Sequence, residues 1–368
     1  MKLFNRFSEK NTIRVVILGG QHCGKTAMLA RMHRAFNDIC RHMGKADIRS
    51  VATSHDNLIN LYTVEKGIYT LPKEKSLQKE FIFPNSIAKA IIPETYEFEL
   101  FSQGKAHMTI ELVEISKKYW ENDPEIVAEV IRKAQAIVVA IDTPSLCERS
   151  GRYCQQNNSI DAITHIITAA ICNNNSNIDD FSHKLILFVP LKCEKEIISD
   201  NGEVNIKGME MVCRNVKEHY CELISRMRND GLRDRITMAI LPISTIKEIE
   251  WCRFAKNEDK AVEGQPYSYF RLRPNLIEKV LYEGPGHEFC EQPLIYILIH
   301  ALEYAKWWHK EKYKRWMPYI IAPKDSPMDR WCHSFIDNKP LQEIIIWLKL
   351  NKMNRSYGFE ILQNPLCL

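Results

Sequence analysis

The chain has 368 residues, and its 45% hydrophobic and 26% charged residues are the composition of an ordinary globular protein. A net charge of +4 is too small to indicate nucleic-acid binding, and no apolar run approaches the roughly 20 residues that a transmembrane helix needs. The 12 cysteines are scattered and include no C-x-x-C pair, which favours a reduced, cytoplasmic protein over one held by disulfides or zinc.

The first predicted elements are a strand, a glycine loop and a helix. Residues 14–18 form an apolar run that is typical of a buried parallel strand. Apolar side chains at three- and four-residue steps from Met28 to Met43 predict a helix with one buried face. The eight residues that follow the strand fit G-x-x-x-x-G-K-[ST], the phosphate-binding loop of P-loop NTPases, and they are Gly19, Gly20, Gln21, His22, Cys23, Gly24, Lys25 and Thr26.

The residue types in this loop suit phosphate chemistry. Gly19 and Gly24 let the backbone turn tightly and approach a phosphate without a Cβ clash. The N–H groups of the loop and of the helix N-terminus then point at the anion. We expect Lys25 to reach the outer phosphates as a point charge and the Thr26 hydroxyl to ligate Mg²⁺.

Further along the chain, strand and helix patterns alternate. An insertion at about 49–93 precedes two adjacent strands at 96–100 and 107–113, which resemble a hairpin. Continuous apolar runs then predict buried strands at 136–141, 184–189 and 236–243. Amphipathic segments predict a helix from Pro124 and helices at 160–171, 207–227 and 292–312. This order predicts an α/β fold with a mostly parallel sheet flanked by helices, over residues 12–305.

The remaining residues, 306–368, are predicted to form a C-terminal helical extension. Five of the 7 tryptophans lie in it: Trp307, Trp308, Trp316, Trp331 and Trp347. It is also basic, with 11 Lys/Arg against 6 Asp/Glu and hence a charge of +5. Such a composition is compatible with a protein partner, nucleic acid or an anionic surface, and equally with tryptophans that pack the extension onto the main domain. Of the partners, we expect a protein.

The order of these elements resembles that of the Ras-like GTPases over residues 12–305. More narrowly, the segments V-P-L-K-C-E at 189–194 and C-E-Q-P-L at 290–294 resemble motifs of the divergent bacterial double-GTPase group, whose members are predicted to serve in antiphage systems. The phosphate loop is the specific match. The resemblance implies a guanine-nucleotide-binding switch that works with Mg²⁺ and a protein partner.

Base recognition is implied at residues 191–194. GTPases carry N/T-K-x-D after this strand, where the Lys stem covers the base and the carboxylate accepts hydrogen bonds from guanine. Lys192 and Glu194 match the last pair at the right spacing, whereas Leu191 replaces the Asn. Ser244 and Thr245 follow the last core strand, where such folds place a backbone contact to the base.

The hydrolytic element departs further from the family. GTPases carry D-x-x-G after the second strand of the adjacent pair, and the Asp holds Mg²⁺ through water. Here Glu114 stands for the Asp, Lys117 replaces the Gly, and Lys118 replaces the Gln that often follows. Asp142, which ends the next apolar run, is the alternative acid.

For the mobile threonine that senses Mg²⁺ in this family, Thr95 and Thr70 are the candidates. Without the Gly and the Gln, hydrolysis should be slow or depend on an activator, and Lys117 or Lys118 would neutralise transition-state charge. Two other functions stay open. One is an ATP-dependent regulator, because Leu191 weakens guanine selectivity, and the other is a degenerate GTPase that serves as a structural subunit.

Overall fold

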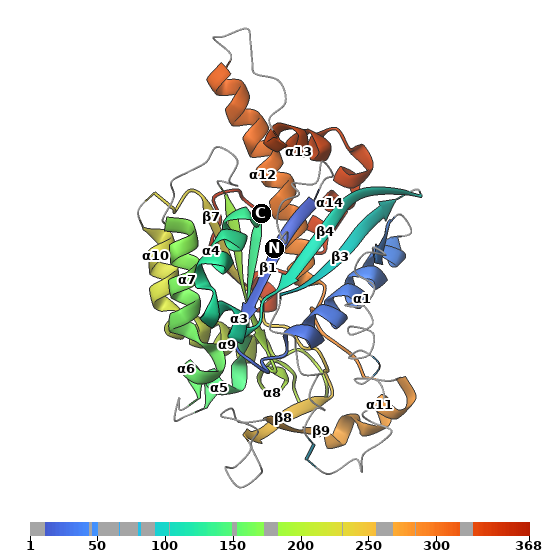
Figure 1. Cartoon of the computed structure of the whole chain (residues 1–368). Coiled ribbons are helices and arrows are strands. Elements are labelled where there is room, and N and C mark those ends of the chain that lie inside the picture. Colours follow the sequence, from blue (N-terminus) through green and yellow to red (C-terminus); the bar gives the residue numbers. More distant parts are fainter. Residues whose placement is uncertain are drawn as a thin grey trace.

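A computed structural model describes residues 12–43, 46–50, 66, 80–81, 93–102, 104–148, 153–172, 183–229, 231–254, 268–283, 285–316 and 327–368. Its main element is an eight-stranded sheet in the order β10-β7-β6-β5-β1-β4-β3-β2 (Figure 1). The strands are β1 (Thr12–Gly19), β2 (Ala46–Ser50), β3 (Glu94–Ser102), β4 (Lys105–Glu114), β5 (Ala136–Asp142), β6 (Lys184–Leu191), β7 (Ile236–Ile240) and β10 (Glu360–Gln363).

The centre of the sheet is parallel and its edges are antiparallel. Strands β4, β1, β5, β6 and β7 pair in parallel, whereas β3 runs against β4, β2 against β3, and β10 against β7. Every residue of β5 and β6 is buried, as expected for central strands covered on both faces. The prediction of an α/β fold with a mostly parallel, helix-flanked sheet is therefore confirmed.

Two hydrophobic clusters fill the space between the sheet and its two helical layers. One face is covered by α4 (Pro124–Lys133), α7 (Ile160–Cys172) and α10 (Cys221–Arg228). The other is covered by α1 (Lys25–Met43), α12 (Gln292–Trp316), α13 (Pro327–Ile336) and α14 (Lys339–Leu350). Helix α9 (Ile206–His219) contributes to both clusters.

The predicted helix at 207–227 is wrong in one respect, because the structure divides it into α9 and α10. The division falls at Tyr220, whose backbone leaves helical geometry with φ −100° and ψ 19°. The side chain of Tyr220 is fully buried, and its ring centroid lies 5.4 Å from that of Phe188 on β6. Packing of this ring against the sheet thus accompanies a bend that the helical periodicity did not reveal.

The C-terminal residues pack into the same core as the rest of the chain. Helix α12 runs through position 306, so no boundary between elements lies there, and β10 extends the main sheet beside β7. Trp331 is buried and its Nε1 donates to the Thr12 carbonyl at 3.0 Å. The partly buried tryptophans that pack on this core are Trp307, Trp308 and Trp347. These tryptophans therefore join the extension to the main domain.

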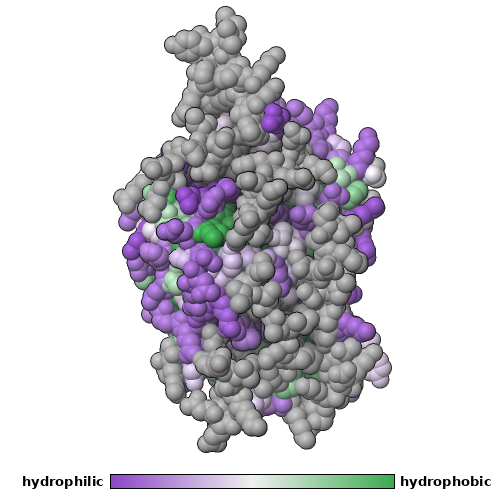
Figure 2. Space-filling model, in the orientation of Figure 1, coloured by the Kyte–Doolittle hydropathy of each residue, from purple (hydrophilic) through white to green (hydrophobic). Residues whose placement is uncertain are grey.

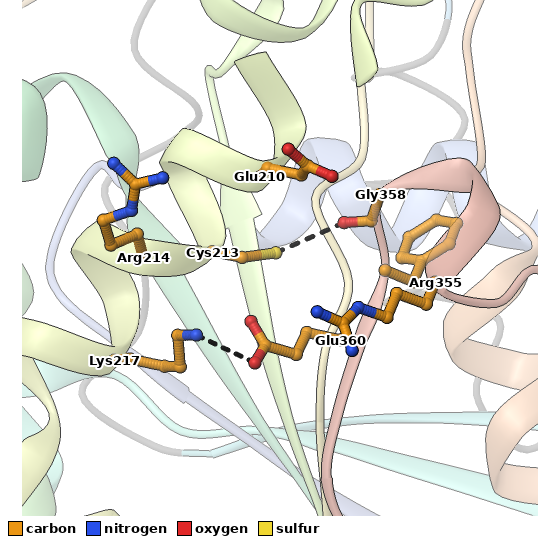
Figure 3. Close-up of a pocket in the computed structure, with 8 residues that line it drawn as sticks. Glu210, Cys213, Arg214, Lys217, Arg355, Gly358 and Glu360 are labelled. Atoms are coloured by element: carbon orange, nitrogen blue, oxygen red, sulfur yellow. Dashed lines mark hydrogen bonds and ion pairs between the residues drawn. The ribbon is translucent and has the colours of Figure 1, made fainter. Parts of the chain in front are cut away.

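The segment 355–360 also contacts α9, around a cavity of about 210 Å³. Figure 3 shows Lys217 of α9 pointing to Glu360 of β10, with their Nζ and Oε1 atoms 2.8 Å apart. The Cys213 thiol donates to the carbonyl of Gly358, which follows the short helix η3 (Arg355–Tyr357). This docking places β10 at the sheet edge.

Several elements lie beyond the carboxyl ends of the parallel strands (Figure 1). Helices α5 (Thr143–Cys147) and α6 (Cys154–Asn158) connect β5 to α7, and the short helices α3 (Lys117–Asn122) and α8 (Glu194–Ile197) follow β4 and β6. The region after β7 holds a hairpin of β8 (Ile249–Phe254) and β9 (Ser268–Leu272), then η2 (Pro274–Leu276) and α11 (Ile277–Glu283). Most of the insertion at about 49–93, including Thr70, lies outside the described residues.

On the face shown in Figure 2, the described residues are mostly hydrophilic and surround a small hydrophobic patch. Within the described part of the chain, no helix has both the length and the hydropathy to cross a membrane.

Candidate functional site

The predicted site residues lie at the carboxyl ends of the parallel strands. Strands β1, β4, β5 and β6 end at Gly19, Glu114, Asp142 and Leu191. In α/β sheets, ligands bind in the crevice outside the carboxyl ends of the strands. The topology therefore brings segments that lie more than 170 residues apart in sequence to one place.

Two glycines of the phosphate loop are required by its geometry. Gly24 has φ +106°, which L side chains rarely adopt. A Cβ on Gly20 would lie 1.5 Å from the carbonyl oxygen of Asn157, so that only glycine fits between the loop and the end of α6. The segment that contains α5 and α6 thus packs directly on the phosphate loop.

Lys25 lies folded back over this loop. Its Nζ donates to the carbonyls of Gly19 at 3.0 Å and Gly20 at 2.8 Å, and the side chain is buried. Both acceptors are neutral, and no carboxylate pairs with this ammonium group in the part of the chain that the structure describes. An anionic phosphate oxygen would be a stronger acceptor for the same donor.

Thr26 and Glu114 form the second pair of the site. The Thr26 hydroxyl donates to Glu114 Oε2 at 3.3 Å, and both residues are buried. Parallel pairing of β1 with β4 sets Glu114 beside Ile17, just before the loop. A hydroxyl and a carboxylate are hard oxygen donors of the kind that Mg²⁺ takes together with substrate phosphates and water. The residues present therefore fit a magnesium ion.

Glu94 is a further acid at this position that sequence reasoning missed. It pairs with Glu114 across β3 and β4, and directly paired residues project from the same face of a sheet. Its Oε2 accepts a hydrogen bond from the Tyr96 hydroxyl at 2.5 Å. Burial, and then the nearby Glu114 carboxylate, raise the pKa of Tyr96, so the phenol stays protonated as a donor. The sequence signal was the alternation of residues 94–98, which places Glu94 and Tyr96 on one face.

Thr95 is not brought to this pair in the structure. It pairs with Val113, so its side chain projects from the face opposite to that of Glu94 and Glu114. The placement of Thr95 as a metal ligand is therefore not supported by the strand register.

Asp142 occupies a different environment from Glu114. Its Oδ1 lies 2.6 Å from Lys192 Nζ, its Oδ2 accepts from the Ser145 hydroxyl, and the Asn158 side chain bonds its backbone N–H and carbonyl. The carboxylate is thus occupied as the ion-pair partner of Lys192. Between the two acids considered for Mg²⁺, the geometry favours Glu114.

Lys117 and Lys118 begin α3. Lys117 Nζ donates to the carbonyl of Gln156 at 3.2 Å and lies 3.7 Å from the Glu121 carboxylate, whereas Lys118 is exposed. Lys117 is therefore turned toward α6, and the structure does not bring either lysine into a contact with Lys25. Their part in hydrolysis stays a prediction.

The residues predicted for base recognition do come together. Glu194 is 1% exposed, and its Oε1 lies 3.2 Å from the Thr245 N–H nitrogen and 3.5 Å from the Ser244 hydroxyl. Its other oxygen, Oε2, is buried and has no hydrogen-bond partner among the described residues. Burial raises the pKa of Glu194 from 4.5 to about 7. A carboxylate oxygen in this position is suited to accept hydrogen bonds from a ligand.

Lys192, two residues before Glu194, has a left-handed backbone conformation, with φ 56°. Its Nζ reaches Asp142 and, at 3.5 Å, the hydroxyl of Ser268 on β9. Leu191, which replaces the family's Asn, is buried and packs toward the phosphate loop, 3.7 Å from where a Cβ of Gly24 would be. Leu191 therefore packs between the phosphate loop and the residues predicted for base recognition.

Two buried arginines brace the base-recognition residues, and neither was predicted. Arg31 on α1 is fully buried, and its Nε donates to the Thr245 carbonyl at 3.0 Å. Arg273, just after β9, donates to the Glu194 carbonyl at 2.6 Å. Arg31 carries a weak sequence signal, because it lies three residues after Met28 on the buried face of its helix, whereas Arg273 carries none.

The phosphate loop after β1, the antiparallel pair β3–β4 beside it and the strand order define a P-loop GTPase-like fold. No protein-family model matches the chain, and a search of curated proteins finds no relative. Among solved structures, the chain is similar to the S. cerevisiae Ski7 GTPase-like domain bound to GDP and inorganic phosphate, with 14% identity and a TM-score of 0.30. The match covers 64% of this chain and 43% of that one.

Proposed function

We propose that this chain binds a guanine nucleotide with Mg²⁺ and acts as a nucleotide-dependent switch within a protein complex. The observation that carries the proposal is the buried Oε2 of Glu194, which has no hydrogen-bond partner among the described residues and follows β6 at the end of the parallel strands where Lys25 lies. Phosphate-binding residues and base-binding residues at the same end of the sheet would contact the two ends of one nucleotide. Guanine offers two N–H donors on one side, and an ionised Glu194 would accept them.

Nucleotide binding would rearrange few residues. Lys25 Nζ would exchange the carbonyls of Gly19 and Gly20 for phosphate oxygens. Thr26 and Glu114 would hold the magnesium ion, which neutralises charge on the phosphates when bound. Lys192 would lay its stem along the base while Asp142 holds its ammonium group.

Hydrolysis by the chain alone should be slow. Lys117 and Lys118 occupy the positions at which GTPases place a γ-phosphate-contacting Gly and a water-positioning Gln, and Lys117 is tied to Gln156. We therefore propose that hydrolysis depends on an activator. A turnover near 1 s⁻¹ by the purified chain, a typical enzyme rate, would contradict this. Binding of ATP in preference to GTP would instead favour an ATP-dependent regulator.

Substitution of Glu114 tests the metal site. In Glu114→Gln we expect GTP affinity in Mg²⁺ to fall about tenfold, because a neutral amide holds the ion less well, while affinity in a chelator stays unchanged. Isothermal titration with and without Mg²⁺ measures this.

Glu111→Gln is the matched control, since Glu111 lies on the same strand but pairs with Arg14. If Asp142→Asn removes the Mg²⁺ dependence and Glu114→Gln keeps it, Asp142 is the metal acid.

The switch itself is tested by the dependence of the complex on nucleotide. We expect wild-type chain and Lys25→Ala, expressed in the native host, to retain different protein partners. An identical assembly would favour a structural subunit. The resemblance to the double-GTPase group leads us to propose further that the complex acts against phage. Plating of phage on cells with the wild-type gene, the Lys25→Ala gene and no gene would test that role.

A further inference from the structure

Arg273 belongs to the β8–β9 region, which a minimal nucleotide-binding sheet does not need, yet its guanidinium group is buried beside Glu194. The side chain is 3% exposed. Its Nη2 donates to the Glu194 carbonyl at 2.6 Å, and its Nη1 donates to the Ser199 carbonyl at 3.0 Å. Both acceptors are neutral, and Asp200, which lies 3.6 Å from Nη1, is 93% exposed. Among the described residues, the guanidinium group therefore has no direct ion pair with a buried carboxylate, and its charge acts at longer range on Glu194 and Glu196.

The position of Arg273 is fixed by the hairpin. Its backbone N–H donates to the Glu248 carbonyl at 2.8 Å, which ties the end of β9 to the start of β8. The hairpin also lies along α8, where Lys195 Nζ is 5.7 Å from the centroid of the Trp251 ring. At the other end of β9, the Ser268 hydroxyl contacts Lys192. Strand β9 and the residue that follows it thus contact both residues that are predicted to recognise the base.

The charge of Arg273 acts on the carboxyl group of Glu194, whose protonated, uncharged form is favoured by burial. Desolvation raises the pKa of Glu194 to about 7, and the backbone N–H groups of Glu194, Thr245 and Ile246, followed by the charge of Arg273, oppose that rise. Other ionisable side chains that interact electrostatically with Glu194 are Cys193, Glu196 and Cys290, and these in turn have Lys195 and Arg31 as charged neighbours. Burial raises the pKa of both Glu194 and Glu196 to about 7. Glu194 is the one of the two whose described contacts include Ser244 and Thr245.

We propose that Arg273 is a positioning residue for guanine recognition, which holds the backbone of Glu194 and favours its ionised, hydrogen-bond-accepting form. This inference rests on the proposed function. It assigns the β8–β9 hairpin a direct effect on base affinity. A protonated Glu194 would present an O–H donor to the N–H donors of guanine and would weaken binding.

The test is the pH dependence of GDP affinity, measured from about pH 5.5 to about pH 9. For the wild-type chain we expect affinity to rise with pH around a midpoint near 7, as Glu194 ionises. In Arg273→Gln the midpoint should move up by about one unit, so that GDP binds roughly fivefold more weakly at pH 7 and recovers to within about twofold at high pH. Recovery at high pH would not follow from a folding defect.

Two further variants make the result decisive. Arg271→Gln removes an exposed arginine of the same strand that pairs with Glu250, and it should behave as wild type. Arg273→Lys keeps the charge but loses the paired donors, so it should keep the midpoint and lose affinity at every pH. The proposal is overturned if folded Arg273→Gln keeps the wild-type midpoint, or if Arg273→Lys shifts it. A wild-type chain that binds no GDP at any pH would overturn the proposed function itself.

Discussion

Replacement of Lys25 by alanine is expected to abolish measurable nucleotide binding while the fold is retained. Among the described residues, the Lys25 ammonium group contacts the carbonyls of Gly19 and Gly20 and the Cys23 sulfur, so its loss leaves no carboxylate without a partner. Loss of charged hydrogen bonds to the phosphates, each worth about 1.5–3 kcal/mol, should weaken binding at least 100-fold. Titration with GTP and GDP in Mg²⁺ measures the change, and thermal unfolding monitors the fold.

Lys184 provides a matched control for this variant. Its buried Nζ likewise donates to two backbone carbonyls, those of Arg132 and Ala134, each at 2.7 Å. However, Lys184 is the first residue of β6 and lies at the amino-terminal end of the parallel strands, away from the phosphate loop. Lys184→Ala should lose comparable local contacts and keep nucleotide affinity. Equal affinities for Lys25→Ala and wild type would show that the loop does not bind phosphate.

Replacement of Glu194 by glutamine is expected to change which base is bound. Guanine presents N–H donors to the site, whereas xanthine presents a carbonyl where guanine has its amino group. The glutamine amide offers a donor where the ionised carboxylate offers only acceptors. We expect GTP affinity to fall about 100-fold and xanthosine triphosphate to become the better ligand, because a site built to hydrogen-bond one group rejects its absence strongly. Competition binding of the two nucleotides measures the reversal.

The fold of this variant should tolerate the change. Because the folded-state pKa of Glu194 is raised to about 7 from 4.5, the unfolded chain ionises first as pH rises. The contribution of this group to stability is therefore full below about pH 4.5 and is lost as pH rises to about 7. In Glu194→Gln the free energy of unfolding should therefore fall less between about pH 4.5 and about pH 7 than it does in the wild-type chain. Denaturant unfolding at these two pH values measures the difference. Retained GTP preference in a folded Glu194→Gln would show that another residue recognises the base.

Long local patterns made much of the fold predictable from sequence. Strands β1, β5 and β6 are continuous apolar runs that the structure buries, and the glycine loop after β1 is specified by residue types at fixed spacing. Strand β10 could not be predicted in this way. It has four residues, and it becomes a strand because β7, more than 100 residues earlier, offers a free edge.

The same difference between local patterns and distant contacts applies to the residues of the candidate site. Residues of a contiguous motif, such as Lys192 and Glu194, could be named as candidates because their spacing suggests the chemistry. Arg31 and Arg273 could not, because the backbone carbonyls that they contact, at Thr245 and Glu194, are far away in sequence. The strand register likewise decided what the sequence left open, since it sets Glu94 beside Glu114 and turns Thr95 away.

The most direct test of guanine-nucleotide binding is to denature the purified chain, identify any nucleotide released, and titrate the emptied protein with GTP, GDP and ATP in Mg²⁺. We predict that GDP or GTP is released and that both bind more tightly than ATP, because Glu194 would accept the N1–H and 2-amino donors of guanine, which adenine does not have at those positions. Preference for ATP would contradict the role of Lys192 and Glu194 in base recognition. Absence of binding to all three nucleotides would contradict the proposed function as a whole.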